Sequence, residues 1–447
     1  MTSACGPKEC VVDDPSTCPA DLTCERVSGR DKPLCFQPVV LRGRVIELGS
    51  GAAIANAQVL ATNADGAPVS APFTSGSDGA YEFRVPTTRS DEAGTIVGHS
   101  VMLRAQARNY VAFPSGARVS LPVSIASASR ATEDQPWVVE SAQTDVFLSP
   151  VEPSVRDLAT VSGKIELGAP QPATLIALEG AGGRTTLAAP DGTFTFFNVP
   201  AGAWRASAYA RGSNYVPVDV SVGSADLADV TITRSSVPTP ALSGSVQLVA
   251  GANGDGTSVV LALESTFIEA LGRGEVPPGL RAPEGGASPN VTGAWTISGI
   301  PDGRYVVLAA FENDGNVRDP DPGISGTGLQ QLTVSNGQLS GATSPAFKVT
   351  SAVELESPGH TGIDETSATP TFRWKKYPNA DAYVLTVFDG LGNLVWTHPI
   401  ADGNASSETY AGPSLPTGGF YQWRITGMRK GAPTSHSEEL RGLFVVR

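Results

Sequence analysis

The sequence is poor in the groups that most enzymes use for proton transfer. It contains only four histidines, His99, His360, His398 and His436, and none of the GxSxG, HExxH, CxxC or glycine-rich phosphate-binding motifs. Histidine is the commonest general acid or base, and each of these motifs serves a defined chemistry. The sequence therefore predicts a protein that is not an enzyme, although a pair of loop carboxylates, as in some glycosidases, would leave no motif.

Long apolar runs and basic runs are also missing. No stretch approaches the about 18 apolar residues that a transmembrane helix requires. No cluster of Lys and Arg could neutralise a row of phosphates, and the formal net charge is −13. The sequence thus predicts neither a transmembrane helix nor a nucleic-acid partner. The opening residues MTSACGPKEC lack the regions of a complete signal peptide, so any such peptide has been removed or was never present.

Cysteine is absent from all but one end of the chain. All five cysteines lie within residues 1–37, a segment too short to bury a core of its own and interrupted by several prolines. Such a segment needs covalent links to become ordered, which favours disulfides and an oxidising compartment outside the cytoplasm. Zinc is the rival interpretation, but the spacing contains no CxxC and no histidine lies nearby.

An odd number of cysteines requires a separate explanation for Cys5. Small residues, Thr-Ser-Ala, directly precede it and resemble the end of a bacterial lipoprotein signal, although the leucine expected farther upstream is absent. The resemblance implies that Cys5 carries a lipid anchor on a bacterial outer membrane or cell surface. It also implies that Cys10, Cys18, Cys24 and Cys35 form two disulfides, in one of three possible pairings. A free or intermolecular thiol at Cys5 is the alternative.

A tight turn followed by an alternating strand occurs three times in the chain. The copies read SDGAYEFRVP from Ser77 to Pro86, PDGTFTFFNVPAGAWRASAYA from Pro190 to Ala210 and VTGAWTISGIPDGRYVVLAAF from Val291 to Phe311. Asp-Gly dipeptides favour tight turns because glycine accepts a positive φ. Apolar residues such as Tyr81, Phe83 and Val85 then recur at every second position, which places them on one face of a sheet. The sequence therefore predicts sandwich cores built around these strands.

A glycine-containing strand and a second apolar strand precede each copy. The glycine-containing strands are LRGRVIEL from Leu41 to Leu48, VSGKIEL from Val161 to Leu167 and LSGSVQL from Leu242 to Leu248. This order of strands resembles the carboxypeptidase regulatory-like domain, a transthyretin-like β-sandwich. The third copy departs from the pattern, with Thr292-Gly293 in place of Asp-Gly and an insertion at residues 265–290. Thr266 and Glu269 in this insertion have capping-box spacing, which predicts one or two helical turns that cover a sheet edge or offer a partner surface.

The last part of the chain has a different pattern. The segments TPTFRWKKYPNADAYVLTVFDGLGNLVW from Thr369 to Trp396 and SLPTGGFYQWRI from Ser414 to Ile425 resemble a fibronectin type III domain. The resemblance implies that Trp374 and Tyr383 are buried and that the hydroxyl of Tyr421 bonds to the backbone at a corner.

These patterns together predict an all-β protein of tandem β-sandwich domains with a disulfide-rich N-terminal segment. The expected parts are a cysteine-rich head with lipid attachment at 1–37, carboxypeptidase regulatory-like sandwiches at 38–150 and 158–235, a transthyretin-like sandwich at 241–350 and a fibronectin type III-like sandwich at 353–447. The segments between 150 and 158 and between 235 and 241 contain prolines, which is typical of semi-rigid linkers.

Two clusters raise the question of a metal ion. Asp314, Asn316, Asp319 and Asp321 lie within eight positions, and their oxygen atoms would suit calcium. The spacing differs from an EF-hand, and an ordinary hairpin loop, which has the same composition, is the favoured interpretation. His436 and Glu439 match the HxxE of zinc carboxypeptidases, but only eight residues follow Glu439 and no third ligand is in view. We interpret this match as a coincidence.

The features combined predict a non-catalytic scaffold or adhesion protein that contacts other cell-surface or secreted proteins in a surface assembly. A glycan-binding module is the first alternative, and exposed coplanar aromatic side chains on one face would favour it. A regulatory subunit of a surface enzyme or motility machine is the second, and co-purification of a stable partner would favour it. Membrane contact is expected only through a lipid anchor, and calcium is the one cofactor considered.

Overall fold

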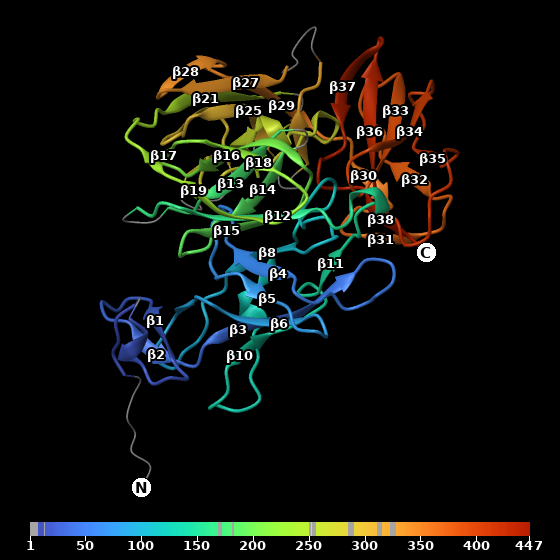
Figure 1. Ribbon diagram of the computed structural model, residues 1–447. Coiled ribbons are helices and arrows are strands. Elements are labelled where there is room, and N and C mark those ends of the chain that lie inside the picture. The colour runs from blue at the N-terminus through green and yellow to red at the C-terminus, as the bar shows by residue number, and fades with distance from the viewer. Residues whose placement is uncertain are drawn as a thin grey trace. The chain divides into compact units, whose positions relative to one another are not determined.

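The chain folds almost entirely into strands and turns (Figure 1). The computed structural model describes residues 8–447 except 13, 169–171, 181–182, 250–251, 253–255, 285–289, 311–314 and 322–327. Contacts divide the chain into two compact units, one of residues 1–114 and 120–157 and one of residues 115–119 and 158–447. The predicted all-β class, with tandem sandwiches and a disulfide-rich N-terminal segment, is confirmed. Within the described ranges, no helix has the length and apolar character needed to cross a bilayer.

The N-terminal segment forms a small sheet in the order β2-β1-β7. Its elements are η1 (Pro15–Thr17), β1 (Thr23–Val27), β2 (Leu34–Phe36) and β7 (Thr88–Arg89). Strand β1 runs antiparallel to β2 and parallel to β7, a short strand that follows the first repeated motif in sequence. We call residues 8–37 of this segment the head.

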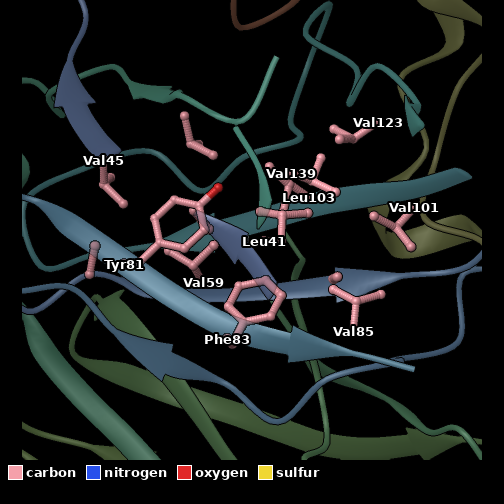
Figure 2. Packing of buried hydrophobic residues seen from close by; sticks show 14 of the residues in the cluster. Leu41, Val45, Val59, Tyr81, Phe83, Val85, Val101, Leu103, Val123 and Val139 are labelled. Atoms are coloured by element: carbon pink, nitrogen blue, oxygen red, sulfur yellow. The ribbon is translucent and has the colours of Figure 1, made fainter. Parts of the chain in front are cut away.

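The first sandwich belongs to the same unit as the head. Its strands are β3 (Val39–Glu47), β4 (Gln58–Thr62), β5 (Phe73–Thr74), β6 (Ala80–Val85), β8 (Ser100–Gln106), β9 (Val123–Ser124), β10 (Trp137–Val139) and β11 (Val146–Leu148), with turns η2 (Ile125–Ser127) and η3 (Pro153–Val155). Strand β3 pairs with β6, β10 and β11, and the second sheet has the order β5-β4-β8-β9. Figure 2 shows how Leu41, Tyr81 and Phe83 meet Val59 and Leu103 in the core between them.

The second sandwich opens the other unit. Its strands are β12 (Ala159–Ile165), β13 (Leu175–Glu179), β14 (Arg184–Leu187), β15 (Thr193–Val199), β16 (Gly202–Tyr209), β17 (Asn214–Tyr215), β18 (Val218–Val222), β19 (Leu227–Ile232) and β20 (Arg234–Ser235). The sheets have the orders β15-β12-β19 and β14-β13-β16-β18, and β17 pairs with β20. Phe194 and Phe196, two residues apart on β15, pack with Ile176, Leu178 and Trp204 from the other sheet.

The third sandwich carries the insertion. Its elements are β21 (Leu242–Leu248), β22 (Ser258–Leu263), η4 (Glu264–Thr266), η5 (Glu269–Leu271), β23 (Arg281–Ala282), β24 (Ala294–Ile297), β25 (Gly303–Ala310), β26 (Asn316–Arg318), β27 (Gln330–Ser335), β28 (Gln338–Gly341) and β29 (Ala346–Ser351). The two helical turns η4 and η5 agree with the expected one or two turns, but the capping box is wrong. Thr266 Oγ1 accepts a hydrogen bond from the Glu275 amide, 2.9 Å away, and η5 begins after Ile268 without a side-chain cap. The hydroxyl of Thr266 thus bonds to the Glu275 amide in place of the helix amide that a capping box would use.

The fourth sandwich is built around aromatic side chains. Its strands are β30 (Leu355–Ser357), β31 (Asp364–Thr366), β32 (Thr371–Trp374), β33 (Ala382–Asp389), β34 (Leu394–Ile400), β35 (Ser407–Thr409), β36 (Phe420–Arg429), β37 (Ala432–His436) and β38 (Leu443–Val446). Trp374 and Tyr383 are fully buried, as expected. For Tyr421 no corner hydrogen bond occurs among the described residues; Tyr410 instead donates its hydroxyl to the Pro413 carbonyl at 2.6 Å.

Candidate functional site

Two disulfides close the head. They join Cys10 to Cys24 and Cys18 to Cys35, with S–S distances of 2.04 and 2.08 Å. The sulfur atoms of Cys10, Cys18 and Cys24 lie within 4.8 Å of one another, a grouping that would also suit a metal ion. A metal binds cysteine as the thiolate, which a disulfide sulfur cannot provide. The structure therefore selects one of the three pairings that the sequence left open.

Strand pairing joins the head to the first sandwich. Arg26 and Val27 of β1 lie opposite Thr88 and Arg89 of β7 in parallel register, and the Ser28 amide donates to the Arg89 carbonyl at 2.8 Å. The covalent links expected from the sequence are thus only part of what orders this segment. The remainder comes from a strand about sixty residues farther along the chain.

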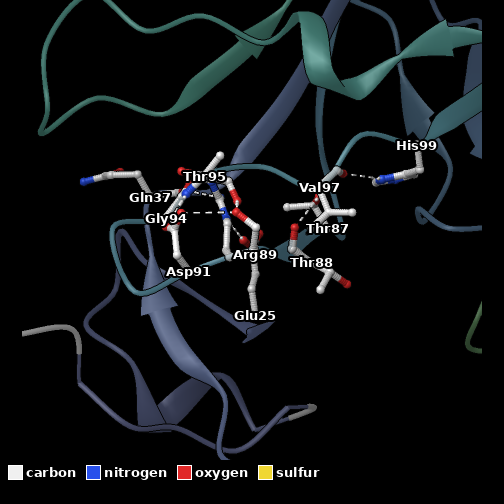
Figure 3. Close-up of polar contacts among 11 residues, drawn as sticks. Glu25, Gln37, Thr87, Thr88, Arg89, Asp91, Gly94, Thr95, Val97 and His99 are labelled. Atoms are coloured by element: carbon white, nitrogen blue, oxygen red, sulfur yellow. Dashed lines mark hydrogen bonds and ion pairs between the residues drawn. The ribbon is translucent and has the colours of Figure 1, made fainter. Parts of the chain in front are cut away.

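The side chain of Arg89 connects strand β1 and the end of the head with the loop that holds Gly94 (Figure 3). Its guanidinium donates from Nε to the Glu25 carboxylate, from Nη1 to the Gly94 carbonyl at 2.8 Å and from Nη2 to the Gln37 carbonyl at 2.9 Å. The guanidinium also lies 5.1 Å from the ring centre of Phe36. Arg89 is fully buried, and a planar cation with a rigid fork of donors suits such a position.

Burial dominates the electrostatics of Glu25. Only 4% of its surface is exposed, and burial raises the pKa of its carboxyl to about 7, even though Arg89 beside it favours the charged form. Its Oε1 atom is buried without a hydrogen-bond partner. Although the pKa of Glu25 is raised, this carboxyl lies in a structural contact with Arg89.

A groove of about 740 Å³ lies between the head and the first sandwich. Its lining is more apolar than polar and consists of Val11, Val12, Asp14, Thr23, Cys24, Glu25, Arg26, Pro38, Val69, Ser70, Ala71, Arg84, Val85, Pro86, Thr87, Thr88, Val97 and His99. Its one histidine, His99, contacts the Val97 carbonyl through Nδ1 at 3.4 Å, and its cysteine is held in a disulfide.

The candidate calcium loop, for which an ordinary hairpin loop is the favoured interpretation, belongs to the third sandwich. Asn316 and Asp319 are buried beside β29, and the Asp319 carboxylate accepts a hydrogen bond from the Asp321 amide at 3.0 Å. Asp314 falls outside the described residues, as does Cys5. Calcium binding stays a prediction, which a melting temperature unchanged by chelator would contradict.

His436 and Glu439 have separate structural contacts. Burial lowers the pKa of His436 to about 3, and its Nδ1 atom lies 2.8 Å from the Ser437 carbonyl. Glu439 forms an ion pair with Arg318 of β26. Sequence reasoning did not identify Glu25, Arg89 or Arg318, and it singled out Glu439 only for its spacing from His436. A single arginine after an apolar strand gives no signal of its own, because its partners are distant in sequence.

No protein-family model matches the sequence, and no curated protein sequence matches it. Among solved structures, two B-repeat units of the collagen-binding protein of Staphylococcus aureus share 12% identity over 91% of this chain and 99% of that chain, with a TM-score of 0.19. A streptococcal ancillary pilin shares 12% identity over 70% of this chain and 98% of that one, with a TM-score of 0.17. The major pilin subunit of Bacillus cereus shares 12% identity over 70% of this chain and 99% of that chain, with a TM-score of 0.17. Similarities at these TM-scores support no conclusion about this chain.

Proposed function

We propose that this chain is a non-catalytic scaffold or adhesion protein of a bacterial surface assembly, working outside the cytoplasm through contacts with other proteins. One observation carries the proposal: the head is closed by two disulfides and continues into the first sandwich through β1, β7 and Arg89. Disulfides persist in oxidising compartments. A lipid on Cys5, three residues before the head in sequence, would anchor the first sandwich through the head.

The ionisable groups near the groove support a structural role. General acid or base catalysis needs a titrating group that can reach a substrate. Glu25 has a pKa of about 7 but is buried against Arg89. This carboxyl thus belongs to a contact that holds two segments of the chain together.

The proposed organisation follows the sequence pattern. It consists of a cysteine-rich N-terminal segment at 1–37, carboxypeptidase regulatory-like sandwiches at 38–150 and 158–235, a transthyretin-like sandwich at 241–350 and a fibronectin type III-like sandwich at 353–447. The similar strand pairings of the first three sandwiches support a common origin for them.

The proposal is tested by cross-linking on intact bacteria that produce the full chain. Cells are treated with a membrane-impermeant cross-linker, and the chain is isolated and its cysteines are mapped by differential alkylation and mass spectrometry. We expect covalent adducts with defined surface proteins, disulfides at Cys10–Cys24 and Cys18–Cys35, and a lipid on Cys5.

A Cys5→Ser variant is the matched control. It is expected to keep both disulfides but to leave the membrane fraction and lose the adducts that depend on anchoring. Free thiols at Cys10, Cys18, Cys24 and Cys35 in the exported protein would refute the proposed compartment. Full-length protein that forms no adducts on intact cells would refute the scaffold role.

A further inference from the structure

The insertion of the third sandwich contacts the fourth sandwich at η5, a helical turn with arginine side chains around it. Arg424 of β36 donates from Nη2 to the Leu271 carbonyl at 2.8 Å and from Nη1 to the Ala270 carbonyl at 3.3 Å. These are the last carbonyls of η5, and a cation is favourable at that end of a helical turn. The side chain of Leu271 packs over Gly392, where an added Cβ would lie 2.8 Å from its Cδ1 atom.

Two further guanidinium groups lie at the same turn. Gly272, which ends η5 with φ of +65°, has the ion pair of Arg318 and Glu439 directly beside it. An added Cβ there would lie 2.4 Å from Arg318 Nη2 and 2.7 Å from Glu439 Oε1. Arg273 follows in the chain and donates from Nη1 to the Ala117 carbonyl at 3.2 Å, within the same compact unit. The charges of Arg273 and Arg318 both lower the pKa of Arg424, although its burial lowers it more.

The positive charges of this cluster exceed the negative ones. Among the described residues, three arginines face one carboxylate, that of Glu439, while Glu438 accepts from the Gly315 amide and pairs with Arg441. His436 is neutral at physiological pH because burial lowers its pKa to about 3. Arg424 is only 9% exposed. Burying unpaired charge is costly, so a counter-charge is expected to accompany these groups.

Three guanidinium nitrogens of the cluster have no hydrogen-bond partner although they are buried. They are Nε and Nη2 of Arg273 and Nε of Arg424. In arginine, Nε and Nη2 carry parallel N–H groups on one edge, and together they form the fork that matches two oxygens of a carboxylate, phosphate or sulfate. The free positions on Arg273 are thus the two that bind an oxyanion together.

We propose that Arg273, with Arg424, binds one small oxyanion between the insertion of the third sandwich and β36 of the fourth. Two oxygens of the anion accept from Nε and Nη2 of Arg273, and the Nε–H of Arg424 donates to the same anion. The anion supplies the missing counter-charge, so it stabilises the junction of the two sandwiches. Guanidinium chemistry accepts both tetrahedral and carboxylate oxyanions, and the site is independent of the proposed scaffold role.

Calorimetric titration of the full chain tests the proposal. The protein is dialysed into a chloride buffer without oxyanions and titrated separately with inorganic phosphate, sulfate and acetate at constant ionic strength. We expect one saturable site per chain for at least one of the three, together with a rise of the melting temperature that saturates over the same concentration range. Binding of phosphate or sulfate alone assigns a tetrahedral anion, and binding of acetate alone assigns a carboxylate.

Variants locate the site. Arg273→Gln is expected to weaken the affinity on the order of tenfold or more, because two charge-assisted hydrogen bonds are lost. Arg205→Gln, which removes an exposed arginine paired with Asp219 in the same unit, is the matched control and keeps the wild-type affinity. Arg273→Lys retains the charge without the fork and is expected to fold and to bind more weakly than wild type.

Three results would overturn the proposal. One is a melting temperature and a heat signal that respond to oxyanions no more than to chloride at equal ionic strength. Another is unchanged affinity in folded Arg273→Gln and Arg273→Lys. The third is an equal loss of affinity in Arg205→Gln, which would show general charge screening rather than a site.

Discussion

Three glycines lie at the same place in three different sandwiches. The strand register sets each one opposite an aromatic residue of the antiparallel neighbour, in the pairs Gly43 with Tyr81, Gly163 with Phe194 and Gly244 with Trp295. A Cβ on Gly163 would lie 2.0 Å from the Val230 carbonyl oxygen and 2.7 Å from the Phe194 ring. The glycine leaves room for the ring to cover the strand, an arrangement known to stabilise glycines in sheets.

This packing predicts that Gly163→Ala destabilises the second sandwich. The methyl group has to displace a backbone carbonyl of β19 or the ring of Phe194, and such overpacking costs about 2–3 kcal/mol. Urea unfolding followed by far-ultraviolet circular dichroism measures the change. Gly223→Ala is the control, because an added Cβ there has no heavy atom within 4 Å, and its effect should stay within about 0.5 kcal/mol. Equal losses in both variants would contradict the steric explanation.

The raised pKa of Glu25 predicts that the head is held more strongly to the first sandwich in mild acid. Its pKa is raised from 4.5 to about 7 in the folded chain, so the folded form binds the proton more tightly than the unfolded form. The resulting stabilisation is complete below about pH 4.5 and is lost as the pH rises through 7. Hydrogen exchange of the Ser28 amide, which bonds across to Arg89, should show greater protection at pH 5 than at pH 8 after correction for intrinsic rates.

Glu25→Gln separates this carboxyl from the other titrating groups of the chain. The amide has nearly the same shape but does not titrate in this range, so the pH dependence of Ser28 protection should disappear. A variant that keeps the wild-type dependence would assign the effect to a different group.

At the scale of elements, local pattern predicted the strands well. In each of the first three sandwiches, the glycine-containing strand pairs antiparallel with the strand of the repeated motif and parallel with a late strand: β3 with β6 and β11, β12 with β15 and β19, and β21 with β24 and β29. Period-two alternation and Asp-Gly turns depend only on neighbouring residues, so the sequence reveals them. The contacts of Arg89 and Arg424 join segments far apart in the chain, which no local pattern encodes.

The capping box at Thr266 and Glu269 shows the same limit within one element. The spacing was correct for a helix start, yet the hydroxyl of Thr266 bonds to the Glu275 amide in a loop that returns to it. Side-chain hydroxyls choose among all nearby backbone groups, including those brought close only by folding. The turns therefore formed where expected, with different bonds at their ends.

Removing one disulfide is predicted to loosen the fold of the head strongly. The Cys18–Cys35 bond closes a loop of sequence separation 17, and the chain-entropy estimate for such a loop is about 3 kcal/mol. We expect Cys18→Ser/Cys35→Ser to make the head susceptible to limited proteolysis while the second unit keeps its unfolding transition. Cys5→Ser, outside the two disulfides, should leave the digestion pattern unchanged. A head that resists protease equally in both variants would show that β1, β7 and Arg89 suffice to order it.

At the scale of the whole chain, the second and third sandwiches share specific polar contacts. The Arg211 side chain donates to the backbone carbonyl of Ser298 at 3.2 Å and to its hydroxyl at 2.8 Å, and it pairs with Glu284. The Asp302 amide donates to the Asn214 side chain at 2.6 Å. These bonds, with those of Arg424 to the insertion, join the second, third and fourth sandwiches within the compact unit that holds residues 158–447.

This clustering predicts two unfolding transitions for the chain rather than four. Sandwiches joined by partly buried polar contacts unfold together when the coupling exceeds the differences in their individual stabilities. Scanning calorimetry of the full chain should resolve one transition for each unit. Arg211→Ala removes three contacts at the junction of the second and third sandwiches, so the transition of the second unit should broaden or split. Arg205→Ala loses only an exposed ion pair and should leave that transition sharp. A sharp transition in Arg211→Ala would instead show that apolar contacts suffice to couple the two sandwiches. The ring pair of Tyr209 and Tyr305, with centres 6.1 Å apart, is one such contact.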